Sequence, residues 1–204
     1  MQTEKRQGIL LLNGEPYERH IEQKDSYTVC CDGAIHWAKN LKIDMHIGDF
    51  DSSNLKAENY LTYPKKKDLT DGELGLRYLI QKGCTDIAIY GGGGKRDDHF
   101  FCNLQLLVYA LRRNITAKLI TNYTTIYCID KSIELIGKKN KILSLAPFLG
   151  DVHIINSEGL QYPLKNSTLY AEECRGLSNC IQKERASITV DSGILLVFEV
   201  DKIV

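Results

Sequence analysis

Residues 86–111 read DIAIYGGGGKRDDHFFCNLQLLVYAL, and this stretch decides the fold of the N-terminal half. Its first five residues, 86–90, are a short apolar run typical of a buried strand. Four consecutive glycines, 91–94, follow the run. Apolar residues then recur at helical spacing from His99 to Arg113. A strand, a glycine loop and a helix in this order are typical of an α/β unit.

The segments upstream repeat the alternation of strand and helix. Strands are predicted at 8–12, 27–31 and 45–47, and a short helix at 34–41. Thr70 and Glu73 match a capping box, which predicts a helix that runs to about Lys82 and stops at Gly83. We therefore predict a mainly parallel sheet with flanking helices.

The sequence changes character after about Asn122. Helical periodicity fades, and β-branched residues and turn signals take over. Residues 187–200 predict a hairpin with a three-residue loop in which Gly193 needs positive φ, and 148–152 predict another turn between strands. The predicted fold is α/β plus β, with an α/β domain at 1–122 and a small β-sandwich or barrel at 123–204.

Composition excludes some partners and places the chain in a compartment. Lys plus Arg and Asp plus Glu number 26 each, so nothing favours a nucleic acid or an anionic membrane as partner. No apolar run approaches a membrane span, and the polar start has no apolar signal segment. The seven cysteines lack zinc-ligand spacing. We expect a reduced, cytoplasmic protein.

Acidic residues gather after the predicted strands. The carboxyl ends of parallel strands share one edge of the sheet, where α/β proteins bind ligands. A cluster of carboxylates with no His or Cys selects a hard cation such as Mg²⁺, which shares its remaining positions with substrate phosphates. The acids are Asp32, Asp49, Asp51, Asp68, Asp71, Asp97 and Asp98.

Several of these positions also have a purely structural interpretation. A single Asp after a strand is often a helix cap or turn residue, an alternative that stays open for Asp68 and Asp97. The glycine loop is either a phosphate cradle or a flexible connection; it is not a Walker loop, because Arg96 stands where Ser or Thr is needed. Arg96 suits a bidentate phosphate contact. His99 either holds Asp98 or acts on substrate.

Five segments together resemble the thiamine pyrophosphokinase family. They are CDGA at 31–34, IGDFDS at 47–52, DLTD at 68–71, the run from Gly91 to Leu107, and RGLSN at 175–179, with the closing SGILL at 192–196. The resemblance covers nearly the whole chain. It implies an enzyme that transfers the pyrophosphoryl group of ATP to thiamine with Mg²⁺, and a homodimer with thiamine bound where the subunits meet.

The same resemblance implies a role for individual residues. The metal ligands would be Asp32, Asp49, Asp51 and Asp71, and the catalytic residues Asp71, Asp49 and Asp98. The ATP-binding residues would be Asp32, Asp68, Gly92, Gly93, Gly94, Arg96, His99 and Asn103, and the thiamine-binding residues Ser178 and Asn179. Asp71 or a neighbouring acid would orient or deprotonate the thiamine hydroxyl.

The sequence departs from the family pattern in three places. Lys66 replaces a frequent Asp, Lys95 replaces a frequent Gly, and Ala34-Ile35-His36 replaces Gly-Ala-Asn. Two other functions compete with the enzyme that the resemblance implies. A metal-dependent glycosyltransferase or phosphatase would use Asp49 and Asp51 but leaves the glycine loop unexplained. A non-catalytic thiamine- or nucleotide-binding regulator would be favoured by lost acids, and none is lost.

Overall fold

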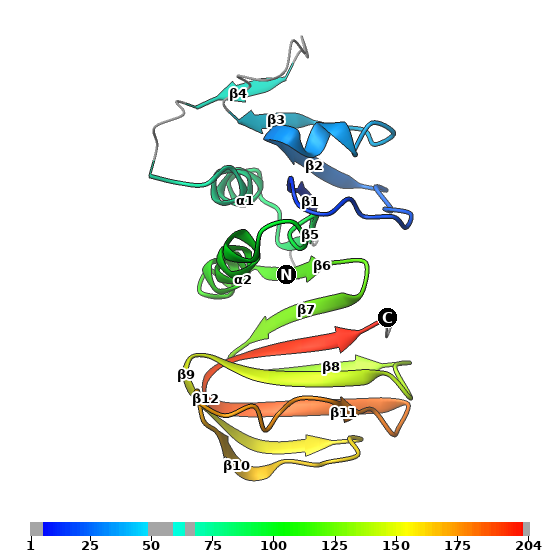
Figure 1. Ribbon diagram of the computed structural model, residues 1–204, viewed down its shortest axis with the longest axis vertical. Helices are drawn as coiled ribbons and strands as arrows, with labels where there is room; N and C mark the ends of the chain where they lie inside the picture. Colours follow the sequence, from blue (N-terminus) through cyan, green and yellow to red (C-terminus); the bar gives the residue numbers. More distant parts are fainter. Residues whose placement is uncertain (1–5, 49–58, 64–67, 202–204) are drawn as a thin grey trace, which may run out of the picture. The chain divides into compact units, whose positions relative to one another are not determined.

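The computed structural model describes residues 6–48, 59–63 and 68–201. The chain divides into two compact units, Met1–Asn122 and Tyr123–Val204. Figure 1 shows the helices α1 and α2 in the first unit and only strands in the second. The chain is thus a mixed α/β protein with few helices. No helix in the described part is long and apolar enough to cross a membrane.

The first unit contains a parallel sheet. Its strand order is β4-β3-β2-β1-β5-β6, and all five of the pairings between these neighbours are parallel. The strands are β1 (Gln7–Leu11), β2 (Ser26–Cys31), β3 (Met45–Gly48), β4 (Tyr60–Thr62), β5 (Asp86–Tyr90) and β6 (Thr116–Ile120). The strands predicted at 8–12, 27–31, 45–47 and 86–90 are confirmed within one residue at each end.

Two α-helices and one short 3₁₀ helix accompany this sheet. The predicted cap of α1 (Asp71–Gln81) is confirmed, because Thr70 Oγ1 accepts from the Glu73 amide at 3.1 Å. The Glu73 carboxylate does not complete the box but accepts from Arg77 at 2.6 Å. The second helix, α2 (Asp97–Leu111), begins two residues earlier than predicted.

The helix predicted at 34–41 is wrong in type and extent. The segment forms the 3₁₀ helix η1 (Asp32–His36) instead. Trp37, at its end, donates its indole N–H to the Leu12 carbonyl at 3.1 Å, which ties the turn to the residue after β1. The tight turn ends there, and the chain continues toward β3.

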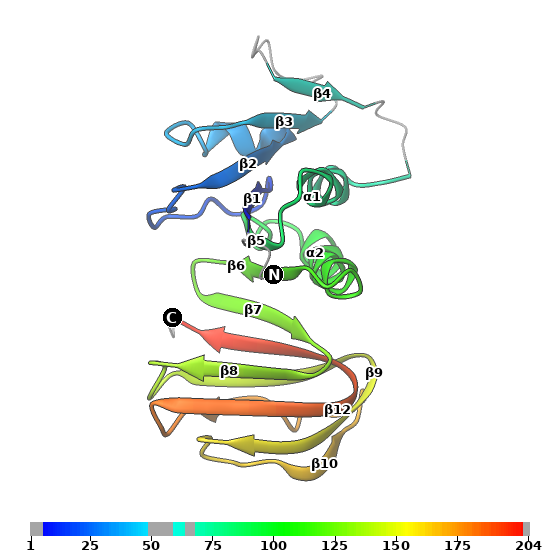
Figure 2. The same cartoon turned by 180° about the vertical axis from the view of Figure 1, so that it is seen from behind.

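Alternation along the central strands buries both faces of the sheet. Ile9 and Leu11 pack with the η1 side of the sheet, in a cluster that includes Cys30 and Ala34. Leu10 points to the other face, against α1, where a side chain on Gly75 would meet it. Figures 1 and 2 show α1 and α2 next to each other along this sheet.

The second unit is antiparallel throughout its described pairings. Two long strands, β9 (Ile142–Glu158) and β12 (Arg185–Val200), pair with each other along most of their length. β7 (Thr124–Ile129) and β11 (Asn179–Cys180) flank one half of this pair. β8 (Ser132–Ile136) and β10 (Lys165–Leu169) flank the other half.

The hairpin predicted at 187–200 is wrong, and so is the turn at 148–152. Both segments lie inside the continuous strands β12 and β9, which face each other there with shifted register. Gly193 has the positive φ that was predicted, at +91°, and Leu149 and Gly150 are also positive. Glycine inside a strand can also mark a bulge or a bend. The glycines at 150 and 193 therefore mark a change of direction within β9 and β12 and not a reversal of the chain.

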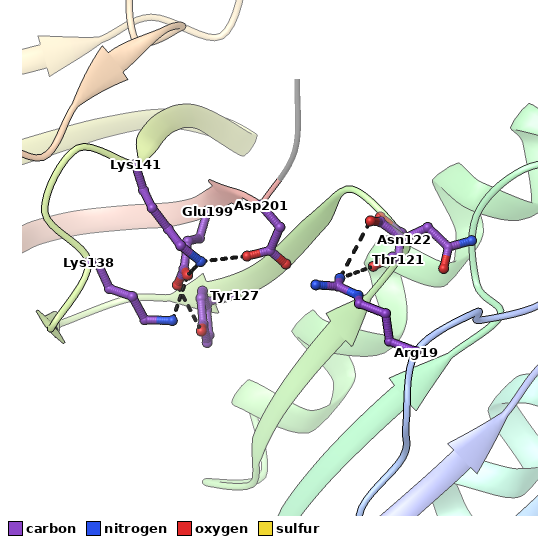
Figure 3. A network of polar contacts seen from close by, with 8 residues as sticks. All are labelled: Arg19, Thr121, Asn122, Tyr127, Lys138, Lys141, Glu199 and Asp201. Carbon is purple, nitrogen blue, oxygen red and sulfur yellow. Dashed lines mark hydrogen bonds and ion pairs between the residues drawn. The ribbon is translucent and has the colours of Figure 1, made fainter. Parts of the chain in front are cut away.

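A buried carboxylate ties the end of β12 to its neighbours (Figure 3). Glu199 is 1% exposed and accepts from Lys138 Nζ at 2.6 Å and from Lys141 Nζ at 2.7 Å. Lys141 also reaches Asp201 at 2.6 Å, and the Tyr127 hydroxyl donates to Glu199 at 3.4 Å. Burial, followed by the charge of Glu199, raises the pKa of Tyr127, so its proton stays on the phenol.

Figure 3 also shows a cluster that belongs to the first unit. The Arg19 guanidinium donates to the carbonyls of Thr121 and Asn122 at 3.3 and 3.5 Å. The Asn122 side chain donates to the Pro16 carbonyl and accepts from the Glu18 amide, both at 2.9 Å. These bonds fasten the connection after β1 to the segment after β6.

Candidate active site

A cavity of about 620 Å³ opens at the carboxyl edge of the parallel sheet. Its lining comes from the segments after β1 and β2, from the start of α1, and from the loop and helix after β5. The register explains the gathering, because Leu11 is paired with both Cys30 and Tyr90. Three neighbouring strands therefore end at one level, and the residues after them meet.

The glycine loop is a fixed wall of this cavity. The amides of Gly14 and Glu15 donate to the carbonyls of Gly91 and Gly93, both at 2.7 Å. The Asn103 side-chain amide donates to the Gly92 carbonyl at 2.8 Å. Three carbonyls of the loop thus accept hydrogen bonds from distant segments of the first unit, which argues against a flexible connection.

Glycine is needed at position 91 for two reasons. Its φ is +69°, and a side chain there would overlap the Leu12 carbonyl. Lys95 also has positive φ, at +57°, although it is not glycine. The departure at position 95 therefore falls where the backbone itself favours glycine.

Arg96 and Asp98 form a two-pronged ion pair at the cavity. Arg96 Nε donates to Asp98 Oδ1 at 3.0 Å, and Nη2 donates to Oδ2 at 2.5 Å. The hydrogen bond from Arg96 is the main cause that lowers the pKa of Asp98 to about 2, with a further contribution from the His99 amide at 2.9 Å. Asp98 is therefore a carboxylate at neutral pH. His99 holds it through the backbone amide.

The structure brings most predicted residues of the ATP site to this one cavity. Those that line it are Asp32, Asp71, Asp98, Gly92, Gly94, Arg96, His99 and Asn103. Gly93 belongs to the loop without lining the cavity, and Asp68 is exposed beyond it. Asp49, Asp51 and Lys66 lie outside the described residues. Asn103 contacts the loop, so its visible role is to hold Gly92.

The described side chains do not form a complete metal site. Among them, no group of three or more His, Cys, Asp or Glu could hold an ion. Asp32 and Asp71 nevertheless line one cavity, and β3 ends at Gly48, where an added Cβ would lie 3.2 Å from the Asp32 Cα. Carboxylate oxygens are the donors that Mg²⁺ prefers, so Asp32 and Asp71 fit this ion.

Several residues that line the cavity were not predicted from the sequence as site residues. They are Asn13, Gly14, Cys31, Thr70 and Cys102. All five are neighbours of predicted residues or follow strands of the same sheet. The rule that located the acids, position after a parallel strand, also applied to 13 and 14.

The two residues predicted to bind thiamine lie in the second unit and differ in environment. Asn179 is buried, and its side chain forms hydrogen bonds with the backbone. Its amide oxygen accepts from the backbone amides of Tyr162 and Cys180 at 3.0 and 2.8 Å, and its amide nitrogen donates to the Tyr162 carbonyl at 2.7 Å. It lines a hollow of about 230 Å³ with Tyr162 and Arg175. Ser178 is exposed, with φ of +56°.

Two family models match the chain, one in each unit. The thiamin pyrophosphokinase catalytic domain matches residues 19–119, and the thiamin pyrophosphokinase vitamin B1 binding domain matches residues 128–195. A thiamine pyrophosphokinase of Bacillus subtilis (strain 168) is 30% identical over 159 residues, which is 73% of this chain and 74% of that protein. The chain belongs to the thiamin pyrophosphokinase family.

Solved structures of thiamin pyrophosphokinases share the fold. The enzyme from Bacillus subtilis superposes with a TM-score of 0.84 at 22% identity, covering 97% of this chain and 99% of the other. The enzyme from Candida albicans gives 0.76 at 17% identity, with 96% and 90% covered. The cavity at the sheet edge lies within the match to the catalytic domain, apart from segment 12–14.

Proposed function

We propose that this chain transfers the pyrophosphoryl group of ATP to the hydroxyl of thiamine, giving thiamine diphosphate and AMP. The observation that supports this most is that the two domain models of the thiamin pyrophosphokinase family match successive parts of the chain. The cavity in the catalytic part adds chemical support. It joins a fixed glycine loop and an arginine, which suit phosphates, to carboxylates, which suit a divalent cation.

The ATP phosphates are assigned to the loop side of the cavity. Gly92, Gly93 and Gly94 with Arg96 and His99 would contact them, and Asn103 would act by fixing the loop. Asp32 lines the same cavity, and Asp68 is assigned to ATP on the family resemblance alone. The family resemblance supports these roles, and the shared cavity supports all of them except those of Asp68 and Gly93.

The Mg²⁺ is assigned to Asp32, Asp49, Asp51 and Asp71. When bound, the ion supplies charge neutralisation for the phosphate oxygens. Asp71 begins α1 at the cavity and would orient the thiamine hydroxyl or accept its proton, together with Asp49 and Asp98. Positioning and electrostatics carry most of the catalysis in such transfers.

Thiamine is assigned to the C-terminal unit. Ser178 would contact it, and Asn179 would shape the hollow by fixing Tyr162. We infer that this unit is a small β-sandwich, with β7-β12-β9-β11 and β8-β12-β9-β10 as layers, because β9 and β12 bend where their register shifts. The family resemblance supports a homodimer in which thiamine binds where the subunits meet. Seven free cysteines support a reducing, cytoplasmic location.

The test is formation of AMP from ATP by the full chain. We expect AMP in stoichiometric balance with thiamine diphosphate only when thiamine and Mg²⁺ are both present. EDTA should abolish the reaction, and added Mg²⁺ should restore it. Sedimentation at micromolar concentration should show a dimer.

Two outcomes would count against the proposal. AMP formation that is independent of thiamine would indicate a hydrolase. Full activity in a preparation verified to be free of divalent cations would remove the role assigned to the acidic residues.

A further inference from the structure

Arg96 binds Asp98 with the guanidinium that the proposed function assigns to the ATP phosphates. The guanidinium donates two hydrogen bonds to the carboxylate, with donor–acceptor distances of 3.0 and 2.5 Å. Both side chains line the cavity and are mostly exposed, at 65% and 62%. The pair is therefore open to solutes and is not buried as part of a core.

A guanidinium edge binds one planar anion at a time with two parallel N–H donors. In this structure Asp98 takes the edge formed by Nε and Nη2 of Arg96. A phosphate that uses the same edge has to displace Asp98. The displaced carboxylate then lies beside an anion, where repulsion disfavours it unless a cation becomes its partner.

We propose that Asp98 holds the phosphate-binding edge of Arg96 in the absence of ligand, so that binding of phosphate there depends on a divalent cation. This inference rests on the proposed function, which assigns Arg96 to the ATP phosphates. Asp98 is in this respect a positioning residue. The pair makes binding of phosphate and of cation favour each other, and it disfavours nucleotide without metal.

Asp97 provides a matched control on the same helix turn. It is exposed and carries the same charge one residue away. Within the described residues it forms no ion pair with Arg96. Asp97→Asn therefore removes one negative charge near the cavity without releasing the guanidinium. Asp98→Asn removes the charge and weakens the hold on the guanidinium.

The experiment is calorimetric titration of inorganic pyrophosphate into the full chain, first with EDTA and then with Mg²⁺. With EDTA, we expect Asp98→Asn to bind pyrophosphate about 2- to 5-fold more tightly than Asp97→Asn, the scale of one exposed ion pair. With Mg²⁺, this advantage should disappear or reverse. Asp98→Ser serves as a second variant, and circular dichroism confirms folding.

A double-mutant cycle isolates the pair. In an Arg96→Gln background, Asp98→Asn and Asp97→Asn should change pyrophosphate affinity equally. Equal gains for the two variants with Arg96 intact would overturn the inference, and the proposed function would stand if Arg96→Gln alone weakens binding. No effect of Arg96→Gln on pyrophosphate with Mg²⁺ would instead remove Arg96 from the proposed phosphate site, and the inference with it.

Discussion

At the scale of single residues, several side chains near the cavity act on the backbone. Asn103 donates to the Gly92 carbonyl, and Trp37 donates to the Leu12 carbonyl. In the second unit, the Asn179 side chain likewise forms hydrogen bonds with the backbone of Tyr162. A polar residue in a family motif can therefore be needed for the shape of a site without touching the ligand.

Asn103 provides a direct test of this distinction. Asn103→Ala removes the donor to Gly92 and frees one carbonyl of the loop, at a cost of about 1 kcal/mol. We expect the KM for ATP to rise about 5-fold, with the KM for thiamine unchanged. Gln105→Ala, an exposed position on the same helix, is the control. An equal rise in both KM values would indicate a general loss of fold.

His46 couples stability to pH. It is 7% exposed and stacks on Tyr60 with ring centroids 5.0 Å apart, and burial lowers its pKa. The unfolded chain then binds the proton more readily, so stability is lost as pH falls below about 6.5. Urea unfolding at pH 7.5 and 5.5 should show a smaller difference in His46→Gln than in the unaltered chain. In the exposed control, His20→Gln, the difference should persist.

At the scale of elements, the largest error of the sequence-based prediction lies where β9 and β12 change direction, a place that we call the corner. The corner comprises residues 148–152 of β9 and 189–194 of β12, where the register of the pair shifts. Both strands cross the corner without a break, and both carry positive φ there, at Leu149 and Gly150 in one and at Gly193 in the other. Turn residues identify where the chain deviates from an extended path. They do not say whether the chain then reverses or continues, because that depends on strands distant in sequence.

Gly193 should therefore be sensitive to substitution. A Cβ there would overlap the Asp151 carbonyl and lie 2.9 Å from the Val152 Cα, in addition to the unfavourable φ. We expect Gly193→Ala to lower the free energy of unfolding by about 2–4 kcal/mol. Gly137→Ala is the control, since φ is +69° but nothing lies within 4 Å, and about 1 kcal/mol is expected. Urea unfolding compares the two, and equal losses would mean that the corner tolerates a side chain.

Four of the six parallel strands that the structure describes and both of its α-helices were predicted from the sequence, whereas β4, β6 and the 3₁₀ form of η1 were not. Alternation, the Thr70 cap and the glycine loop are local signals, and each element that they predicted is present. The pairing of Arg96 with Asp98 has no comparable signal. Whether the side chains of two residues at a helix start meet depends on the local backbone and on their rotamers, which the sequence pattern does not specify.

At the scale of the whole molecule, the two units carry separate cores and separate parts of the proposed function. The cavity lined by the glycine loop and Arg96, which are assigned to phosphate, lies within the first unit. The hollow with Asn179 lies within the second. The sequence indicated this organisation through the change of pattern near Asn122. It could not indicate the buried cluster of Glu199, because its four charges are spread over 138–201.

Glu199 allows the second unit to be weakened selectively. Glu199→Gln leaves the ammonium groups of Lys138 and Lys141 without their shared carboxylate, although both lysines are one-third exposed and can turn to water. We expect a loss of about 1–3 kcal/mol in the unfolding of this unit. Heating should then abolish thiamine binding at a lower temperature than in the control Glu172→Gln. ATP binding at 25 °C should be unchanged, and its loss would show that the units are not independent.

The corner shared by β9 and β12 also has a consequence for synthesis of the protein. Ribosomes elongate at roughly 5–20 residues per second, so β9 is synthesised seconds before β12, the strand that pairs with it along most of its length. During that interval a 17-residue strand, with buried-type residues along one side, has an open edge. Until β12 has emerged, this edge is open to pairing with other strands, which is the kind of exposure that makes nascent chains prone to aggregation.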